Sequence, residues 1–151
     1  MRVLDQKKVK YTPHAIGDNT AMTGEQVAQA LSKPADEVFK TLVTVGKSGA
    51  NYVFVVPISG ELDLKKAAKA VGEKSIEMLK SRELLPLTGY VHGGCSPIGM
   101  KKFFKTTVDI SAKEKQTICF SAGKIGFQVE IVPDDLSRVI RFSYSDIASH
   151  S

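Results

Sequence analysis

The sequence predicts one α+β domain with a curved, mixed and mostly antiparallel β-sheet, barrel-like in outline and flanked by short helices. Strand-like segments outnumber helical ones, and they follow one another along the chain instead of alternating regularly with helices. The size agrees with one domain, because 151 residues with 42% hydrophobic residues fill a single substantial core. We therefore expect residues 1–151 to form a single domain.

Two short helices are predicted by their caps and by the spacing of their apolar residues. Thr23–Gln26 has the Thr-x-x-Gln spacing of a capping box, and the apolar residues of Val27–Leu31 follow it. In Leu64–Val71 the apolar residues recur at helical spacing, with Asp63 before them and Gly72 after them. Further helical pieces are expected at Ser81–Leu85, stopped by Pro86, and from Asp134 through Ile140.

A hairpin is the strongest strand prediction. Val38–Val45 and Tyr52–Pro57 are rich in β-branched and aromatic residues, and the glycine-containing segment Gly46–Asn51 joins them. The remaining strands are expected, in order, at Val9–Pro13, Ser75–Met78, Tyr90–His92, Thr106–Ile110, Thr117–Ser121 and Phe127–Val132.

The composition excludes several classes of protein. With 25% charged residues, 12 glycines and 6 prolines, the chain is neither collagen-like, nor a coiled coil, nor disordered throughout. The longest apolar run, Tyr52–Ile58, is far shorter than the roughly 20 residues that cross a bilayer. The first residues resemble no secretory signal, so we expect a cytoplasmic protein with no membrane partner. Cys95 and Cys119 are then expected to be free thiols.

The positive charge is clustered. The chain has 21 Lys and Arg against 16 Asp and Glu, a net charge of +5. This excess fits a polyanionic partner without requiring one, and a solvated face is the alternative for any one cluster. The clusters are Lys7/Lys8/Lys10, Lys65/Lys66/Lys69 with Lys74, and Lys101/Lys102/Lys105.

The segment Gly93–Lys102 is the least ordinary part of the sequence, because glycines and a proline crowd it between two predicted strands. Glycines let a ligand approach the main chain, and consecutive amides form an anion or oxyanion nest. A tight turn at a sheet corner is the alternative. The segment is not a P-loop, because Met100 stands where the lysine is required and Pro97 lies inside.

The histidine, cysteine and lysine side chains in and around this segment suggest further chemistries. His92 and Cys95 could form a nucleophile pair or half of a metal site. The chain has three histidines and two cysteines with no paired ligand motif, so we expect no metal and no cofactor. Lys40 shares a strand face with Val38 and Leu42, and it is either an edge-strand gatekeeper or a functional ammonium in a cleft.

Taken together, three segments resemble the YbaK/EbsC family, whose members are similar to the editing domain inserted in bacterial prolyl-tRNA synthetase. The segments are Val38–Val43, Leu62–Lys66 and Gly89–Gly99, and the resemblance runs in order from about Val9 to Ile140. It implies a compact α+β fold whose curved mixed sheet holds a pocket for an aminoacyl-3′-adenosine. It is closer to the YbaK branch, which deacylates Cys-tRNA(Pro), than to the branches that remove alanine from that tRNA.

The resemblance also implies roles for individual residues. The family lysine that matches Lys40 is essential, and the Gly-Ser-Pro loop positions the aminoacyl carbonyl and the terminal ribose. Three pocket positions depart from the family: His14 falls where a tyrosine is frequent, Thr23 where a phenylalanine is common, and Gln128 where some members carry a carboxylate. The implied substrate-binding residues are His14, Thr23, Thr41, Gly93, Gly94, Ser96, Pro97, Gly99, Ser121 and Gln128, with Lys101 and Lys102 placed to meet the tRNA backbone.

The chemistry that the resemblance implies is substrate-assisted. The thiol of the misattached cysteine attacks its own ester carbonyl, forms a thiolactone and releases the tRNA, so Cys95 stays a spectator. The expected partners are the acceptor end of tRNA(Pro) and, as a candidate, prolyl-tRNA synthetase. The alternatives are a deacylase for another small aminoacyl-tRNA(Pro), and a binding protein that only sequesters a nucleotide or a tRNA 3′ end.

Overall fold

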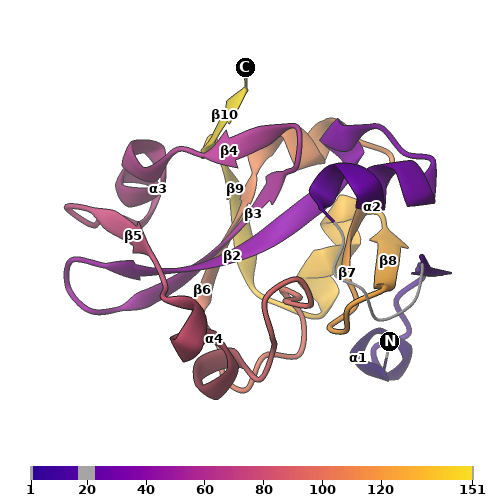
Figure 1. Ribbon diagram of the computed structural model, residues 1–151, viewed down its shortest axis with the longest axis horizontal. Helices are drawn as coiled ribbons and strands as arrows, with labels where there is room; N and C mark the ends of the chain where they lie inside the picture. Colours follow the sequence, from indigo (N-terminus) through magenta and orange to yellow (C-terminus); the bar gives the residue numbers. More distant parts are fainter. Residues whose placement is uncertain (1, 17–22, 151) are drawn as a thin grey trace.

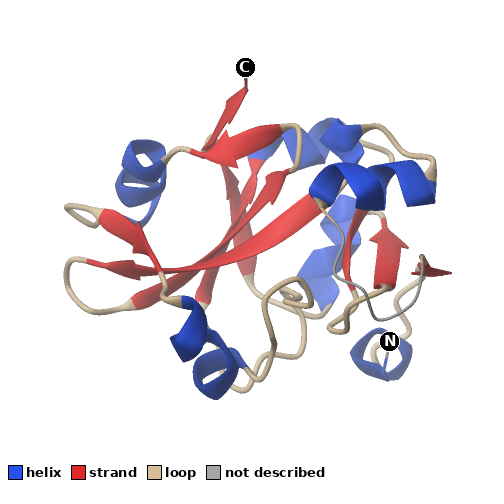
Figure 2. Ribbon diagram, in the orientation of Figure 1, coloured by secondary structure: helices blue, strands red, loops and turns tan. Residues whose placement is uncertain are grey.

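The computed structural model describes residues 2–16 and 23–150, which fold into three β-sheets with short helices around them (Figures 1 and 2). The elements, in chain order, are α1 (Arg2–Gln6), β1 (Thr12–Ala15), α2 (Gly24–Leu31), η1 (Ala35–Glu37), β2 (Phe39–Gly46), β3 (Asn51–Pro57), β4 (Gly60–Leu62), α3 (Leu64–Val71), β5 (Ile76–Met78), α4 (Ser81–Thr88), β6 (Lys105–Asp109), η2 (Ile110–Glu114), β7 (Ile118–Ser121), β8 (Phe127–Ile131), η3 (Pro133–Arg138), β9 (Phe142–Ser145) and β10 (Ala148–His150).

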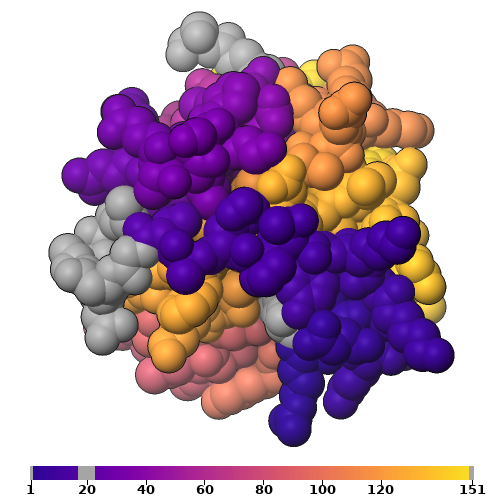
Figure 3. Space-filling view, turned by 90° about the vertical axis from the view of Figure 1, so that its right-hand side faces the viewer, coloured from indigo at the N-terminus to yellow at the C-terminus, as the bar shows by residue number. Residues whose placement is uncertain are grey.

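The largest sheet has the strand order β5-β2-β3-β6-β9. The hairpin β2–β3 is antiparallel, whereas β6 and β9 add to it in parallel. A second sheet, β1-β8-β7, and a two-stranded sheet, β10-β4, are antiparallel throughout. In the space-filling view of Figure 3, the indigo N-terminal residues lie beside the orange residues of the β7–β8 hairpin. The described strands are therefore mixed and mostly antiparallel, as predicted, but they close no barrel.

The core divides along the two faces of the large sheet. On one face, Phe39, Val43 and Val53 pack with residues of the second sheet such as Phe120 and Val129. On the other face, a smaller cluster joins Phe54 and Val56 of β3 to Ala67 and Ala68 of α3. In a third cluster, residues of α2 pack against Val38 and Cys119. The strand β2 thus borders all three clusters, which fixes its position firmly.

Local signals in the sequence predicted the central elements well. Thr23 caps α2 with both hydrogen bonds of a capping box, and Asp63 accepts from the amides of Lys65 and Lys66 at the start of α3. Gly72 ends α3 in the left-handed conformation, with a φ of 76°. The predicted hairpin is confirmed, with Lys40 opposite Val56 in its register.

Several boundaries were predicted wrongly. The first strand begins at Thr12 instead of Val9, which is buried in the main core before the strand. The segment predicted as a strand at Tyr90–His92 belongs to a loop, because Tyr90 turns inward and its hydroxyl donates to the carbonyl of Ile98. Pro86 does not stop α4, which continues to Thr88 and ends at Gly89.

The expected final helix is a 3₁₀ segment, Pro133–Arg138, that ends before Ile140. Six elements, α1, η1, β4, η2, β9 and β10, had no counterpart in the sequence prediction, and three of them are strands. Each of these three strands has only three or four residues and pairs with a distant segment, so no local hydrophobic pattern marks it.

Candidate active site

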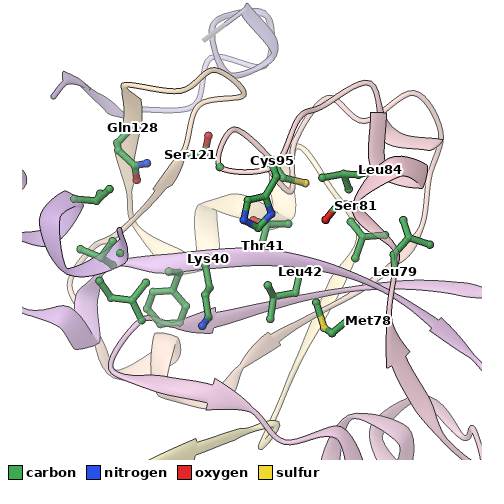
Figure 4. A pocket seen from close by; sticks show the side chains of 18 residues that line it. Lys40, Thr41, Leu42, Met78, Leu79, Ser81, Leu84, Cys95, Ser121 and Gln128 are labelled. Atoms are coloured by element: carbon green, nitrogen blue, oxygen red, sulfur yellow. The ribbon is translucent and has the colours of Figure 1, made fainter. Parts of the chain in front are cut away.

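A pocket of about 260 Å³ runs along the outer edge of β2. Its ends lie at α2 and at the start of α4, and the loop after α4 and the β7–β8 hairpin cover it (Figure 4). The described residues that line it are Gly24, Val27, Val38, Phe39, Lys40, Thr41, Leu42, Val43, Ile58, Met78, Leu79, Ser81, Leu84, His92, Gly93, Cys95, Ser121 and Gln128.

The edge of β2 that faces the pocket presents open main-chain groups. The carbonyl of Val38 accepts from the amide of Ile58, so the even-numbered residues of β2 direct their main chain toward β3. Thr41 therefore directs its amide and carbonyl to the opposite edge. On that side, pairing with the β5 segment starts only at Val43, whose carbonyl accepts from the amide of Leu79. Neither this pairing nor the parallel bridge between Val38 and Cys119 includes Thr41, which lines the pocket between them.

One wall of the pocket is polar. Figure 4 shows Thr41, Cys95, Ser121 and Gln128 on the same side of β2. Thr41 Oγ1 and Gln128 Oε1 are both buried and have no hydrogen-bond partner among the described residues. A buried polar atom without a partner costs about 1–3 kcal/mol, so a bound ligand or an ordered water gains by pairing with these two atoms.

The opposite wall carries the positive charge. Lys40 lies there with Leu42 and Met78 (Figure 4), which confirms that Lys40 and Leu42 share a strand face. Lys40 Nζ donates to Glu61 Oε2 at 3.1 Å. Among the described lining residues, Lys40 is the only lysine, and there is no aspartate or glutamate. The pocket therefore suits a ligand with anionic and hydrogen-bonding groups.

The loop that follows α4 is held in place by a side-chain hydrogen bond and by close packing of its backbone. The side chain of Tyr90 reaches across the loop to the carbonyl of Ile98, and burial raises the pKa of its phenol. A Cβ at Gly94 would lie 3.3 Å from the amide nitrogen of Ile125, so the loop backbone needs glycine to approach the β7–β8 turn. Gly93 has a φ of 86°, which also favours glycine.

Several amides of this loop already donate hydrogen bonds, including those of Tyr90 and Lys101, which donate to Thr88. Gly94 donates to the carbonyl of Val91, and Ile98 donates to the hydroxyl of Ser96. Within the described residues, the amides of Gly93 and Cys95 have no such acceptor, and both residues line the pocket. These two amides are consequently the candidates for binding a carbonyl oxygen.

The pocket offers no activated nucleophile of its own in the described part of the chain. Burial raises the pKa of the Cys95 thiol to about 12, so the reactive thiolate is scarce near neutral pH. The hydroxyl of Ser121 accepts from the amide of Gly123, and among the described side chains no histidine is hydrogen-bonded to it. An acyl transfer in this pocket would need its nucleophile from the substrate or from water.

The structure brings together five of the predicted site residues, Lys40, Thr41, Gly93, Ser121 and Gln128. Gly94, Ser96 and Pro97 are buried behind the wall, and Gly99 is exposed at the end of the loop. Thr23 caps α2 beside the lining residue Gly24, while His14 borders a shallower hollow next to Gln128 and binds Glu130. Lys101 and Lys102 are exposed outside the pocket.

Sequence reasoning missed the apolar part of the lining. Met78, Leu79 and Leu84 reach the pocket because β5 leads directly into α4, a connection that only the fold reveals. The described residues contain no group of three or more His, Cys, Asp or Glu side chains that could hold a metal ion. No helix in the same part of the chain is long and apolar enough to cross a membrane.

Comparisons with known proteins identify relatives of this chain. EbsC of Enterococcus faecalis, to which a Cys-tRNA(Pro)/Cys-tRNA(Cys) deacylase activity is assigned, is 41% identical over 150 residues, which cover 99% of this chain and 92% of that protein. A proline–tRNA ligase of Thermosipho africanus is 33% identical over 92 residues, 61% of this chain but only 15% of the ligase.

Solved structures share the fold. A crystal structure described as a trans-editing enzyme for prolyl-tRNA synthetase has a TM-score of 0.84 at 23% identity, with 98% of this chain and 93% of that chain covered. A hypothetical protein, APE2540, gives a TM-score of 0.86 at 19% identity, over 98% of this chain and 97% of its own. The family model of the aminoacyl-tRNA editing domain matches residues 18–139. This chain therefore belongs to the aminoacyl-tRNA editing domain family.

Proposed function

We propose that this protein is a trans-editing deacylase that cleaves the aminoacyl ester of misacylated tRNA, with Cys-tRNA(Pro) as its main substrate. The activity assigned to EbsC, with which this chain shares 41% identity over nearly its whole length, supports Cys-tRNA(Pro) as the substrate. The single observation in the pocket that supports the mechanism is its content: the described lining has one ammonium, one imidazole (His92), two buried polar atoms without partners, and a cysteine thiol whose pKa is raised by burial.

In the proposed reaction the substrate supplies its own nucleophile. The cysteinyl sulfur attacks the ester carbonyl, a C–S bond forms and the C–O bond to the terminal ribose breaks. The electron pair leaves with the ribose oxygen, which takes the proton released by the thiol. Water then opens the thiolactone to free cysteine. The enzyme contributes by holding the thiol against the carbonyl and by stabilising the negative charge that develops on the carbonyl oxygen.

The described residues supply both contributions. In this proposal the amides of Gly93 and Cys95, two residues that line the pocket, bind the developing oxyanion, and Lys40 attracts the anionic tRNA end. Thr41 Oγ1 and Gln128 Oε1 accept hydrogen bonds from the aminoacyl group or the ribose, which gives these buried atoms their partners. Lys101 and Lys102, exposed outside the pocket, meet the phosphate backbone of the acceptor arm.

The tRNA(Pro) acceptor end is the proposed substrate partner, and prolyl-tRNA synthetase is the proposed protein partner. A match to 15% of the length of a proline–tRNA ligase supports a shared origin with a segment of that enzyme. A domain that clears errors on the same tRNA gains from acting beside the synthetase, because the effective concentration of the misacylated product is highest there.

A deacylation panel tests the proposal. Catalytic amounts of protein are incubated with Cys-, Ala-, Ser- and Pro-tRNA(Pro), and release of the free amino acid is followed. We expect multiple turnovers with Cys-tRNA(Pro) and slow release from the others. Faster release of alanine or serine would reassign the substrate, and binding of tRNA without turnover on any of the four would favour a sequestering protein.

A further inference from the structure

Lys40, which lines the pocket, forms an ion pair with Glu61, which does not line it. Glu61 belongs to β4, and its carboxylate accepts from Lys40 Nζ at 3.1 Å. The side chain of Lys40 is 33% exposed and that of Glu61 is 79% exposed. Lys40 is the only lysine among the described lining residues, so this one carboxylate neutralises the positive charge of the pocket.

The backbone beneath Glu61 is held firmly. Glu61 lies opposite Ser149 in the β4–β10 pairing, and Ser149 Oγ donates to the Glu61 carbonyl at 3.4 Å. The strand β10 is in turn fixed to the core, because the buried carboxylate of Asp109 accepts from the amides of Ile147 and Ala148, each at 3.0 Å. The fold therefore keeps the carboxylate of Glu61 within reach of Lys40.

The side chain of Glu61, by contrast, is held weakly. Its carboxylate has one bond to a described group, and an ion pair with so exposed a partner contributes about 0–1 kcal/mol. A phosphate of a tRNA end carries the same charge as the carboxylate and likewise shares it over two oxygens. It can therefore replace the carboxylate on Lys40 at little cost.

We propose that Glu61 is an exchangeable counter-ion of Lys40: it holds the ammonium at the pocket in the free protein and yields it to a phosphate of the incoming tRNA end. The inference rests on the proposed function, since it requires an anionic substrate at Lys40. Glu61 is thus a counter-ion that touches Lys40 and not the substrate, and it takes no part in the reaction itself. Its charge weakens substrate binding slightly, because the substrate must displace it before it reaches the ammonium.

The test is a double-mutant cycle of Glu61→Gln and Lys40→Ala. Glutamine keeps the size of the side chain and removes its charge, so the exposed position tolerates it. With Lys40 present, we expect Glu61→Gln to lower KM for Cys-tRNA(Pro), and Kd for uncharged tRNA(Pro), by about two- to fivefold with kcat unchanged. In the Lys40→Ala background, Glu61→Gln is expected to leave Kd unchanged.

A matched control separates a local effect from the general charge of the protein. Glu25 is an exposed carboxylate on α2, directly after the lining residue Gly24, and no basic group among the described residues pairs with it. Glu25→Gln removes the same charge near the pocket, and we expect no change in KM. An equal gain from Glu25→Gln, or the same gain from Glu61→Gln without Lys40, would overturn the inference.

A higher KM or a lower kcat in Glu61→Gln would also overturn it, because Glu61 would then orient Lys40 for the reaction. Failure of the proposed function would give a different result, because the wild-type protein would then not deacylate Cys-tRNA(Pro) at all. In that case the Kd arm with uncharged tRNA(Pro) still reports whether Glu61 and Lys40 are coupled.

Discussion

Glu61 and Glu130 each bind a lysine, but their surroundings differ. Glu61 is 79% exposed and has one partner, Lys40, at the edge of the pocket. Glu130 is 15% exposed and accepts from Lys33 and His14, both at 3.0 Å, and from the hydroxyl of Thr117. The hydrogen bond from Thr117, with those from His14 and Lys33, lowers the pKa of Glu130 to about 2 despite its burial.

The difference teaches how to assign a role to an ion pair. A carboxylate with several partners in a partly buried site resists exchange, because removing one group leaves the others unpaired. A carboxylate with one partner and wide exposure to water is exchanged readily. Glu130 therefore stabilises the contact between β8 and the segment after α2, while Glu61 leaves Lys40 available to a ligand.

The largest expected effect comes from breaking each pair at its lysine. Lys40→Ala should lower kcat/KM for Cys-tRNA(Pro) about 100-fold or more and leave the melting temperature unchanged, because its partner Glu61 is solvated. Lys40→Arg should also be poor, since a planar guanidinium does not reproduce a compact ammonium. Lys33→Ala is the matched variant and should lower the melting temperature with kcat unchanged. Near-wild-type turnover by Lys40→Ala would remove Lys40 from the site.

A second prediction compares the two carboxylates directly. Glu130→Gln should reduce the free energy of unfolding by about 1–3 kcal/mol at pH 7, and Glu61→Gln should leave it unchanged. The pKa of Glu130 is lowered from its ordinary 4.5 to about 2, so its contribution is complete above pH 4.5 and disappears as the pH falls toward 2. Urea titrations between pH 7 and pH 3 should show that the free energy of unfolding falls less in Glu130→Gln than in the wild type. An equal fall in these two proteins would contradict this assignment.

The smallest effect is expected from lysines that pair with no carboxylate in the described residues. Lys101 Nζ lies 3.5 Å from the Pro86 carbonyl, and Lys102 Nζ lies 5.6 Å from the centre of the Phe104 ring. Changing both lysines to alanine should weaken tRNA binding and flatten its salt dependence by roughly one unit of slope for each lost phosphate contact. Turnover at saturating tRNA should change little. An unchanged salt slope would mean that the tRNA approaches from elsewhere, with the α3 lysines Lys65, Lys66 and Lys69 next to be tested.

The sequence predicted those parts of the fold that local signals determine. The helices α2 and α3 carry their own caps, and the β2–β3 hairpin carries its own pattern. The strands β4 and β10 could not be predicted in this way, because each has three residues and their partners lie almost 90 residues apart, as in the pair Glu61 and Ser149. Pro86 is tolerated because it is exposed near the end of a short helix, where the carbonyl that loses its partner remains close to water.

In the candidate site, too, residues with a local sequence signal were predicted and residues that depend on distant contacts were not. Lys40 and the glycine loop stood out in the sequence because a lysine among strand residues and a cluster of glycines are unusual. The resemblance to a family implied that they belong to one site, and the structure places Lys40 and Gly93 in one pocket. Glu61 carried no such signal, since an exposed glutamate is ordinary and its contact with Lys40 depends on the turn between β3 and β4.

The central claim is that the reacting sulfur belongs to the substrate, and exchanging sulfur for oxygen on each side tests it most directly. Single-turnover rates are measured for wild-type protein and Cys95→Ser, each with Cys-tRNA(Pro) and Ser-tRNA(Pro). Burial raises the pKa of the Cys95 thiol to about 12, so the account predicts fast cleavage of Cys-tRNA(Pro) by both proteins and slow cleavage of Ser-tRNA(Pro) by both. Loss of activity in Cys95→Ser, with an acyl group trapped on Cys95 of the wild type, would contradict it.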